Sequence, residues 1–210
     1  MKTTILITGT SRGIGKALAL HFLSQGVKVI GSSRKTQSEL THYPNFFSLK
    51  LDLSNSKSRA TAIQQVQDNF ESIDILINNA GIGPDIDHCT PSAVDLENIL
   101  SVNLSGTVLF TEELIGHMTL KGKIINISSK MGSINSCKKS DSTAYRISKA
   151  ALNMYTQILN IRVKKGLVIA AVHPGWVKTS FAPSNIYGRL TSILKKAIVF
   201  LVKPLGSSVK

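Results

Sequence analysis

The chain has 210 residues, of which 42% are hydrophobic and 18% charged, and its formal net charge is +13. This length suits a single domain, and the hydrophobic content excludes a disordered tail. Two cysteines, Cys89 and Cys137, are too few for a disulfide framework or a cysteine metal cluster, and they fit a reducing, cytoplasmic compartment. The apolar run at the N-terminus leads directly into a glycine motif, so we predict a strand there rather than a signal peptide.

Short apolar strands alternate with helical patterns along the chain. Strands are predicted over 3–9, 27–34, 46–54, 73–81, 122–129 and 166–175, and helices over 13–26, 56–71, 95–118 and 143–164. Nearly continuous apolar strands separated by helices are typical of a parallel sheet that is covered on both faces. Because crossovers are right-handed, we predict an α/β fold: a three-layer, doubly wound sheet of the Rossmann type, in one domain over 1–210.

The stretch "TGTSRGIG" (8–15) joins the first predicted strand to the first predicted helix. Glycines at this place allow a tight turn and a close backbone approach to a pyrophosphate, which the N-terminus of the helix also attracts. The alternative is an ordinary turn that requires glycine. The position of the motif favours a dinucleotide site formed by Thr8, Gly9, Ser11, Arg12, Gly13, Ile14 and Gly15.

The end of the second predicted strand bears on the choice of dinucleotide. An acid there would bind the ribose 2′-hydroxyl of NAD, but this chain has Ser33 followed by Arg34. Arg12 and Arg34 suit a 2′-phosphate, because a guanidinium pairs with phosphate in a fork geometry. We therefore favour NADP(H) over NAD(H), and two solvated arginines are the alternative. Asp52, with Leu53, is predicted to lie near the adenine.

The positive charge is concentrated near the C-terminus. After Asp141 the sequence has no Asp or Glu and eleven Lys or Arg residues. Such asymmetry fits nucleic acid, an anionic membrane surface or a phosphate-bearing ligand, and it also fits a solvated basic face. A predicted helix over about 189–202 has one apolar face, so it either packs over the site or rests peripherally on an anionic membrane. Nucleic acid is not expected, because no recognition element is present.

The stretch "STAYRISK" (142–149) places Tyr145 four residues before Lys149, so the two side chains share one face of a helix. Taken alone, they read as a packed tyrosine and a solvated lysine. Ser128 and Ser129 end the fifth predicted strand, where strand alternation sends their side chains in opposite directions. Ser148, beside Lys149, is interpreted as an ordinary helix residue.

Six motifs follow one another in the order found in a known family. The sequence resembles the classical type of the short-chain dehydrogenase/reductase family over residues 3 to about 180. The stretches "ISSKMGSI" and "HPGWVKT" are most similar to the sub-group of C-factor and sniffer-type carbonyl reductases. The motifs are "TGTSRGIG" (8–15), "NNAG" (78–81), Asn103 in "SVNLSG", Ser128-Ser129 in "NISS", Tyr145 and Lys149 in "YRISK", and "PGWVKT" (174–179).

The resemblance implies an oxidoreductase whose cofactor carries the hydride. Tyr145 would donate the proton, or accept it in the reverse direction. A free phenol has a pKa of about 10, and the ammonium of Lys149 would lower the pKa of Tyr145 while also holding the nicotinamide ribose. Ser129, usually the second serine of such a pair, would bind the substrate oxygen. Asn103 would anchor a water that links Lys149 to solvent.

The resemblance also assigns the rest of the cofactor groove. Asn79, Ala80 and Gly81 would line it, whereas Asn78 would tie neighbouring strands together. Pro174, Gly175, Val177 and Thr179 would surround the nicotinamide. The five histidines have no ligand spacing with cysteines or acids, so we expect no metal.

The chain departs from the family in two places. Ser129 lies further from Tyr145 than is usual, and the extra residues fall in the polar stretch "CKKSDS" (137–142). Family members also continue with a further helix and a seventh strand, so we expect six strands. The sixth strand would then be an exposed edge of the sheet, at which chains could associate. A homodimer or a homotetramer is therefore an open alternative. Either a truncation or a naturally shortened member would give this pattern.

Two functions are therefore weighed. The first is an NADP-dependent oxidoreductase that reduces a small aldehyde or ketone, or oxidises the corresponding alcohol. The second is a cofactor-binding signalling or scaffold protein with little turnover, associated with a membrane surface. The complete set of Tyr145, Lys149, Asn103 and Ser129 favours the enzyme, and the short C-terminus favours the alternative.

Overall fold

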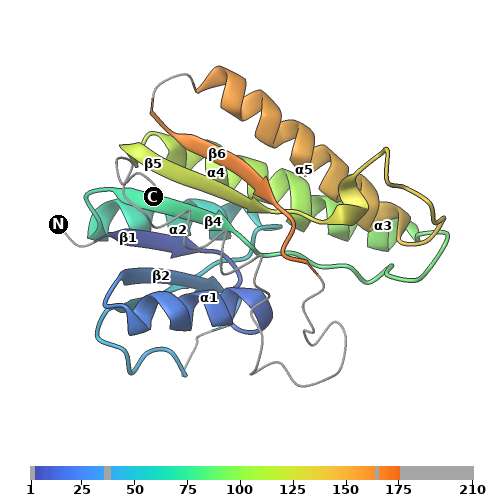
Figure 1. Ribbon diagram of the computed structural model, residues 1–210. Helices are drawn as coiled ribbons and strands as arrows, with labels where there is room; N and C mark the ends of the chain where they lie inside the picture. The colour runs from blue at the N-terminus through green and yellow to red at the C-terminus, as the bar shows by residue number, and fades with distance from the viewer. Residues whose placement is uncertain (1–2, 36–38, 164–165, 176–210) are drawn as a thin grey trace.

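Six parallel strands form one sheet in the order β3-β2-β1-β4-β5-β6 (Figure 1). The computed structural model of the chain describes residues 3–35, 39–163 and 166–175. The strand order runs outward from the centre in both directions, so the predicted doubly wound sheet is confirmed. The strands are β1 (Thr4–Ile7), β2 (Lys28–Ser33), β3 (Phe46–Lys50), β4 (Ile73–Asn78), β5 (Met118–Ile127) and β6 (Val168–Val172).

Helices cover both faces of the sheet and make it the middle of three layers (Figure 1). On β1, the side chains of Ile5 and Ile7 pack with α1 on one face, while Leu6 packs with α2, α4 and α5 on the other. This alternation follows from the two-residue period of a strand. The helices are α1 (Gly13–Ser24), α2 (Ser56–Asn69), α3 (Ala93–Leu100), the π-helical η1 (Ser101–Gly106), α4 (Thr107–Ile115), the short η2 (Lys130–Gly132) and α5 (Thr143–Arg162).

The single helix predicted over 95–118 is wrong in one respect: a π-helical segment, η1, interrupts it between α3 and α4. At its end, the hydroxyl of Thr107 donates to the carbonyl of Val102, five residues earlier, at 3.0 Å. A Cβ on Gly106 would lie 2.2 Å from the carbonyl oxygen of Leu53, so only glycine lets the helix pack there. Such π turns often mark functional sites, and this one carries Asn103.

Several predictions concern residues after Gly175. Val177, Thr179, the helix expected over about 189–202, its proposed membrane contact and the question of a seventh strand all lie outside the described residues. Among the residues that the structure does describe, no helix is both long enough and apolar enough to cross a membrane.

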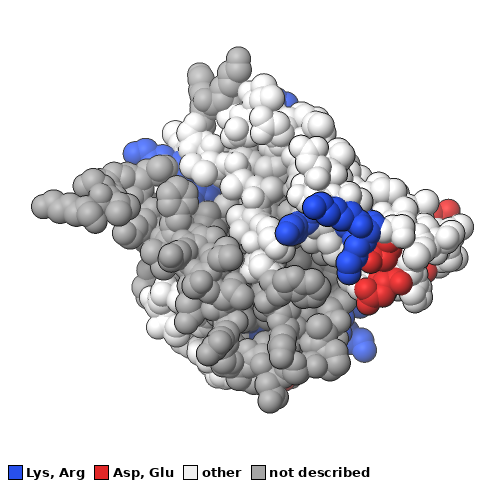
Figure 2. Space-filling model, turned by 45° about the vertical axis from the view of Figure 1, so that its right-hand side comes forward, with Lys and Arg blue, Asp and Glu red and all other residues white. Residues whose placement is uncertain are grey.

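The described basic residues after Asp141 do not form an exposed positive face. Arg146 pairs with Asp141 at 2.7 Å, and Arg162 pairs with Glu112 at 2.6 Å. Lys149 is buried, with 5% of its surface exposed. Figure 2 shows Lys and Arg side chains directly beside Asp and Glu side chains on the face that it presents. Eight of the eleven Lys and Arg residues after Asp141 lie outside the described ranges.

A buried polar network crosses the centre of the fold. The side-chain amide of Asn78, on β4, donates to Thr111 of α4 and to Asn126 of β5, both at 2.8 Å. Asn126 in turn donates to Thr156 of α5 at 2.8 Å. Four elements are thus joined by side chains that the apolar core surrounds, and the predicted strand-tying role of Asn78 corresponds to these contacts. Buried polar groups of this kind are costly unless they are paired.

Replacing Asn126→Ala should lower the stability of the fold. The change removes two buried hydrogen bonds and leaves part of the Asn78 amide unpaired, at a cost of about 2–3 kcal/mol. We expect the midpoint of thermal unfolding to fall by about 4–12 °C, measured by circular dichroism. Asn98→Ala, at an exposed position of α3, is the control and should change the midpoint little. An unchanged midpoint in Asn126→Ala would contradict the structural role of the network.

Candidate active site

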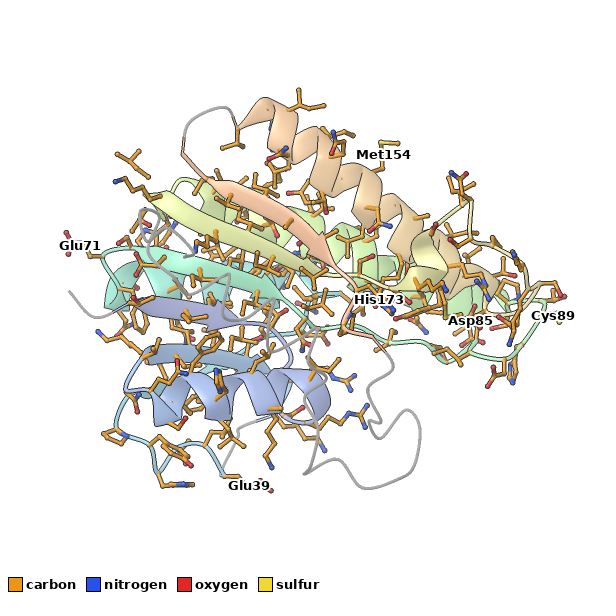
Figure 3. The ribbon with its side chains drawn as sticks, viewed as in Figure 1. Glu39, Glu71, Asp85, Cys89, Met154 and His173 are labelled. Carbon is orange, nitrogen blue, oxygen red and sulfur yellow. The ribbon has the colours of Figure 1, made fainter. Side chains whose placement is uncertain are left out.

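Most of the predicted site residues follow the carboxyl ends of the strands. Thr8 and Gly9 follow β1, Asn79 to Gly81 follow β4, and Ser129 follows β5. In Figure 3, His173 beyond β6 and Asp85 beyond β4 lie at this same end of the sheet. The strand order reverses between β1 and β4, and ligands of doubly wound sheets bind outside such a switch point.

The glycine loop has the backbone geometry that its sequence predicts. Gly9 and Gly13 have φ values of +76° and +59°, which side chains strongly disfavour. A Cβ on Gly15 would lie 2.2 Å from the carbonyl oxygen of Gly9, so α1 can start this close to β1 only with glycine. The N-cap residue Arg12 makes no side-chain capping hydrogen bond, and the first turn has no acid. The partial positive charge at the N-terminus of α1 is therefore not compensated by an acid of its own first turn, and it can attract an anion.

Contacts from β4 hold this loop in place. The Asn79 side-chain amide donates to the carbonyls of Thr8 and Gly9 at 2.9 and 3.1 Å. The backbone N–H groups of Asn79 and Ala80 donate to the Thr8 hydroxyl, both at 3.0 Å. The side chain of Thr8 is thus buried support for the loop, with 1% exposed. Ser11 and Ile14 lie in the loop and at the start of α1, where they were predicted.

The predicted adenosine side of the groove is polar and open. Arg12 and Arg34 are both exposed, and no acid ends β2. Asp52 is half-buried and accepts hydrogen bonds from the backbone and hydroxyl of Ser54 at 3.0 and 2.6 Å. Leu53 is buried against Gly106. The donors and the glycine cradle therefore fit a phosphorylated dinucleotide.

Tyr145 and Lys149 lie one turn apart at the start of α5, beside the end of β5. The Ser129 hydroxyl faces the phenol of Tyr145, near enough to favour its ionised form. The Lys149 ammonium lies 5.6 Å from the centroid of the Tyr145 ring and donates to the carbonyl of Ile127 at 2.9 Å. The structure thus brings together a phenol, a hydroxyl and an ammonium from three positions in the sequence.

The two serines at the end of β5 point to different partners. The hydroxyl of Ser128 is directed into the fold and donates to Asn153 of α5 at 2.6 Å. Ser129 instead accepts a hydrogen bond from the backbone N–H of Met131 at 3.1 Å and faces Tyr145. Of the pair, Ser129 is therefore the serine that can reach a substrate oxygen beside the phenol.

Asn103 lies behind this group, on η1. Its side chain exchanges two hydrogen bonds with the backbone of Ile82, both at 2.8 Å, and donates to Ser148 at 3.2 Å. Ser148 donates to the carbonyl of Tyr145 at 2.8 Å. A Cβ on Gly81 would lie 3.2 Å from Asn103 Oδ1 and 3.7 Å from Lys149 Nζ. Asn103 and Lys149 therefore both border Gly81, and a relay water between them stays a prediction.

The comparisons with known proteins can be set against this geometry. A family model described as short chain dehydrogenase matches residues 3–186. The chain belongs to the short-chain dehydrogenase family. The family resemblance found in the sequence is therefore confirmed, and it covers every described site residue.

Individual relatives of this short-chain dehydrogenase are moderately similar. The 3-oxoacyl-[acyl-carrier-protein] reductase FabG of Buchnera aphidicola subsp. Schizaphis graminum is 32% identical over 194 residues, which are 89% of this chain and 78% of that protein. The NADPH-bound carbonyl reductase from chicken fatty liver has a TM-score of 0.79 at 28% identity, covering 88% of this chain and 80% of that one. A structure described as the carbonyl reductase Sniffer of Caenorhabditis elegans has a TM-score of 0.74 at 26% identity, covering 83% and 86%.

The short-chain dehydrogenase relatives extend further than this chain. The chain spans 64% of the length of one of them, an uncharacterized oxidoreductase of Schizosaccharomyces pombe, and 85% of the length of another, from Arabidopsis thaliana. Part of each relative therefore has no counterpart in these 210 residues. Among the described residues, no group of three His, Cys, Asp or Glu side chains is placed to hold a metal ion.

Burial acts on both titratable groups of this short-chain dehydrogenase site. It lowers the pKa of Lys149 from 10.5 to about 8. Burial raises the pKa of Tyr145 above its ordinary value of 10.0, and the neighbouring hydroxyl of Ser129 opposes that rise. Desolvation of the phenolate thus outweighs the effect of Ser129. The lowering of this pKa by Lys149 stays a prediction.

Two residues at the site escaped the sequence reasoning. Ser148 was interpreted as an ordinary helix residue, but it links Asn103 to the backbone of Tyr145. Nothing in the sequence pattern points to Asp85, whose carboxylate accepts hydrogen bonds from the backbone N–H groups of Ala144 and Tyr145. The contacts of Ser148 with Asn103 and of Asp85 with α5 have no local signal, because the partners are brought together only by the fold.

Lys149→Met should stabilise the protein relative to wild type in a pH-dependent way. The folded-state pKa of about 8 lies below the unfolded value of 10.5, and this difference corresponds to a burial cost of roughly 3 kcal/mol. The cost is fully present below pH 8 and disappears as the pH rises through 8 towards 10.5. The unfolding midpoint of the variant minus that of wild type should therefore fall between pH 7 and pH 10. If the difference between the two midpoints does not change with pH, burial of the Lys149 ammonium does not destabilise the fold.

Proposed function

We propose that this short-chain dehydrogenase transfers a hydride between NADP(H) and a small carbonyl or alcohol substrate. The observation that carries the proposal is the Tyr145 phenol, which lies beside the Ser129 hydroxyl at the carboxyl edge of the sheet, with the Lys149 ammonium 5.6 Å from the centroid of its ring. A proton donor, a hydroxyl for the substrate oxygen and a fixed positive charge are the groups that carbonyl reduction needs from a protein.

The cofactor would lie across the groove formed by the glycine loop, Asn79 to Gly81 and Pro174-Gly175. When bound, NADP(H) supplies or accepts the hydride. Arg12 and Arg34 are exposed on the side of the groove where a 2′-phosphate would lie, and no carboxylate there would repel it. The NADPH-bound carbonyl reductase from chicken fatty liver is similar in structure, which supports the choice of NADP(H). Val177 and Thr179 belong to this proposal on sequence grounds alone.

The described residues then have distinct roles in the proposed reaction. Ser129 donates a hydrogen bond to the substrate oxygen, and Tyr145 gives its phenolic proton to the same oxygen. The raised pKa of Tyr145 keeps the phenol protonated near neutral pH, which suits a proton donor in the direction of reduction. Lys149, with a pKa of about 8, is mostly charged at pH 7 and stabilises the phenolate that remains. Asn103 and Ser148 hold the segment around these groups.

Tyr145→Phe tests the proton donor directly. NADPH oxidation should be followed by absorbance with a panel of aldehydes, ketones and quinones. Because general acid catalysis contributes about 10²–10⁴-fold, we expect kcat to fall by at least about 100-fold with the best substrate. The dissociation constant for NADPH should stay within about twofold, since the ring is kept.

Two outcomes would count against this proposal. Equal rates for wild type and Tyr145→Phe would remove Tyr145 as the acid. Binding of NADPH without turnover of any compound in the panel would favour the second function, a cofactor-binding protein with little turnover. Direct measurement of NADPH binding by fluorescence separates these outcomes from a loss of folding.

Arg34→Asp tests the choice of cofactor. The new carboxylate would repel a 2′-phosphate and accept a hydrogen bond from a ribose 2′-hydroxyl. A charge-assisted hydrogen bond contributes about 1.5–3 kcal/mol, so the ratio of kcat/KM for NADPH over NADH should fall by roughly 10–100-fold. Lys28→Asp makes the same charge reversal at the exposed opposite end of β2 and should leave the ratio unchanged. If Arg34→Asp keeps the preference of wild type, Arg34 does not contact the phosphate.

A further inference from the structure

The helix that carries Tyr145 does not supply its own N-terminal cap. The N-cap residue Ser142 has a left-handed backbone, with φ of +56°, and makes no side-chain capping hydrogen bond. An N-cap side chain ordinarily accepts a hydrogen bond from the second or third N–H group of a helix. Here both N–H groups, those of Ala144 and Tyr145, donate to Oδ2 of Asp85, at 2.8 and 3.3 Å. The cap of α5 therefore comes from a residue 59 positions before Ala144.

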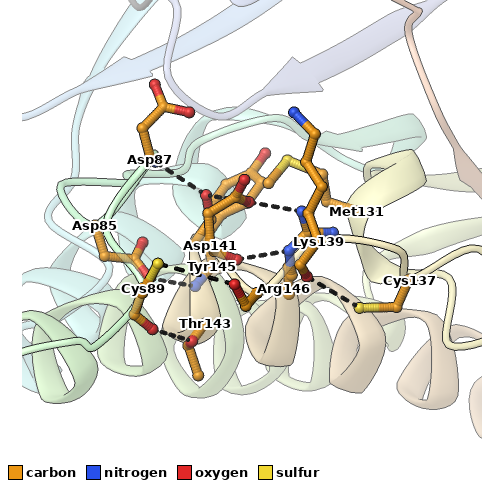
Figure 4. A network of polar contacts seen from close by, with 12 residues as sticks. Asp85, Asp87, Cys89, Met131, Cys137, Lys139, Asp141, Thr143, Tyr145 and Arg146 are labelled. Carbon is orange, nitrogen blue, oxygen red and sulfur yellow. Dashed lines mark hydrogen bonds and ion pairs between the residues drawn. The ribbon is translucent and has the colours of Figure 1, made fainter.

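The residues after Asp85 enclose the same helix end (Figure 4). The backbone N–H of Asp87 donates to the hydroxyl of Ser142 at 3.1 Å. The N–H of Ser142 donates to the carbonyl of His88 at 2.8 Å, and the hydroxyl of Thr143 donates to the carbonyl of Cys89 at 2.8 Å. We call residues 85–89, with their contacts to residues 142–145, the α5 clasp.

The polar stretch 137–142 ends inside this clasp. The guanidinium of Arg146 bonds to both the carboxylate and the backbone carbonyl of Asp141, each at 2.7 Å. The Ser142 hydroxyl donates to the same carboxylate at 3.2 Å. These contacts of the stretch hold Ser142 in its left-handed conformation. The first N–H groups of α5 can then donate to Asp85.

The carboxylate of Asp85 is buried more completely than a surface cap would be. The residue is 0% exposed, and its Oδ1 atom is buried with no hydrogen-bond partner among the described residues. A buried carboxylate is expensive unless something compensates its charge. The two N–H groups and the positive end of the α5 dipole are the compensation that the structure offers. This arrangement fixes the backbone of Tyr145 itself rather than a remote part of the helix.

The loop that leads to the clasp also touches the ring of Tyr145. A Cβ on Gly83 would lie 3.1 Å from Cδ2 of Tyr145 and 3.0 Å from Cδ1 of Ile86. The backbone of one loop therefore supports the ring, while the carboxylate of Asp85 supports the backbone of the same residue. One segment therefore supports both the backbone and the ring of Tyr145.

We propose that Asp85 is a positioning residue for Tyr145: its buried carboxylate fixes the first turn of α5, and so places the phenol against Ser129. This inference rests on the proposed function of Tyr145 as proton donor. Asp85 would not touch the substrate, so its loss should reduce kcat and leave cofactor binding nearly intact.

Three variants test the kinetic consequence. In Asp85→Ala the two N–H groups lose their acceptor, and kcat for the carbonyl substrate should fall by about 10–100-fold, because a shift of about 1 Å in a reacting group can cost 10²-fold. KM for NADPH should stay within about twofold. Asp85→Asn keeps an acceptor oxygen of the same reach and should restore kcat to within about threefold of wild type. Asp87→Asn makes the same chemical change on an exposed side chain of the clasp and should behave as wild type.

Hydrogen exchange on the wild-type protein supplies a second test that needs no variant to fold. First-turn amides of a helix lack intrahelical acceptors, so those of Ala144 and Tyr145 would exchange fast without Asp85. We expect both to exchange at least about 100-fold more slowly than in an unstructured chain. Fast exchange of both amides, a wild-type kcat in Asp85→Ala, or an Asp85→Asn variant as slow as Asp85→Ala would each overturn the proposal. If no carbonyl compound is turned over, the proposed function fails, while the exchange rates still decide whether the clasp exists.

Discussion

The buried ammonium of Lys149 is the constraint on which the arrangement of the site depends. Its Nζ atom is held by the carbonyl of Ile127, at the last position of β5, because a buried charge needs a partner. A Cβ on Gly132 would lie 2.6 Å from the carbonyl carbon of Lys149, so η2 packs directly on α5 at the same place. Once α5 is fixed to the end of β5 in this way, Tyr145 must lie one turn earlier, beside Ser129.

The remaining contacts transmit this placement to the rest of the sheet. The network from Asn78 through Asn126 to Thr156 joins β4, β5 and α5 within the core. Beyond the end of β4, Asn79 is hydrogen-bonded to the glycine loop and Ile82 is hydrogen-bonded to Asn103. Residues of β4 and of the segment after it thus fix the position of the loop predicted to bind the pyrophosphate relative to the helix that carries Tyr145. Polar side chains suit this role better than apolar ones, because hydrogen bonds fix direction as well as distance.

The sequence could predict the parts of this molecule that have a local signal. Alternating apolar strands and helices gave the doubly wound sheet, and strand alternation separated Ser128 from Ser129. The π turn at η1 was missed, because it depends on Gly106 meeting the carbonyl of Leu53 from a distant segment. Asp85 was missed for the same reason: a carboxylate caps α5 only after β4 and α5 have packed. A contact between residues 59 positions apart leaves no periodic pattern in the sequence from which it could be predicted.

The pKa shifts of Tyr145 and Lys149 could not be predicted from the sequence either, because their main cause is burial rather than pairing. Desolvation favours the neutral form of each group, so it raises the pKa of the phenol and lowers that of the ammonium. Below a pH of about 8 the pair is a protonated phenol beside a charged lysine. In the proposed reaction, this is the state that donates the proton and then stabilises the phenolate. Above that pH the lysine loses the charge on which this stabilisation depends, while the phenol still holds its proton. The depth of burial, and not the Tyr-Lys spacing alone, therefore sets the pH range over which the pair can act as an acid.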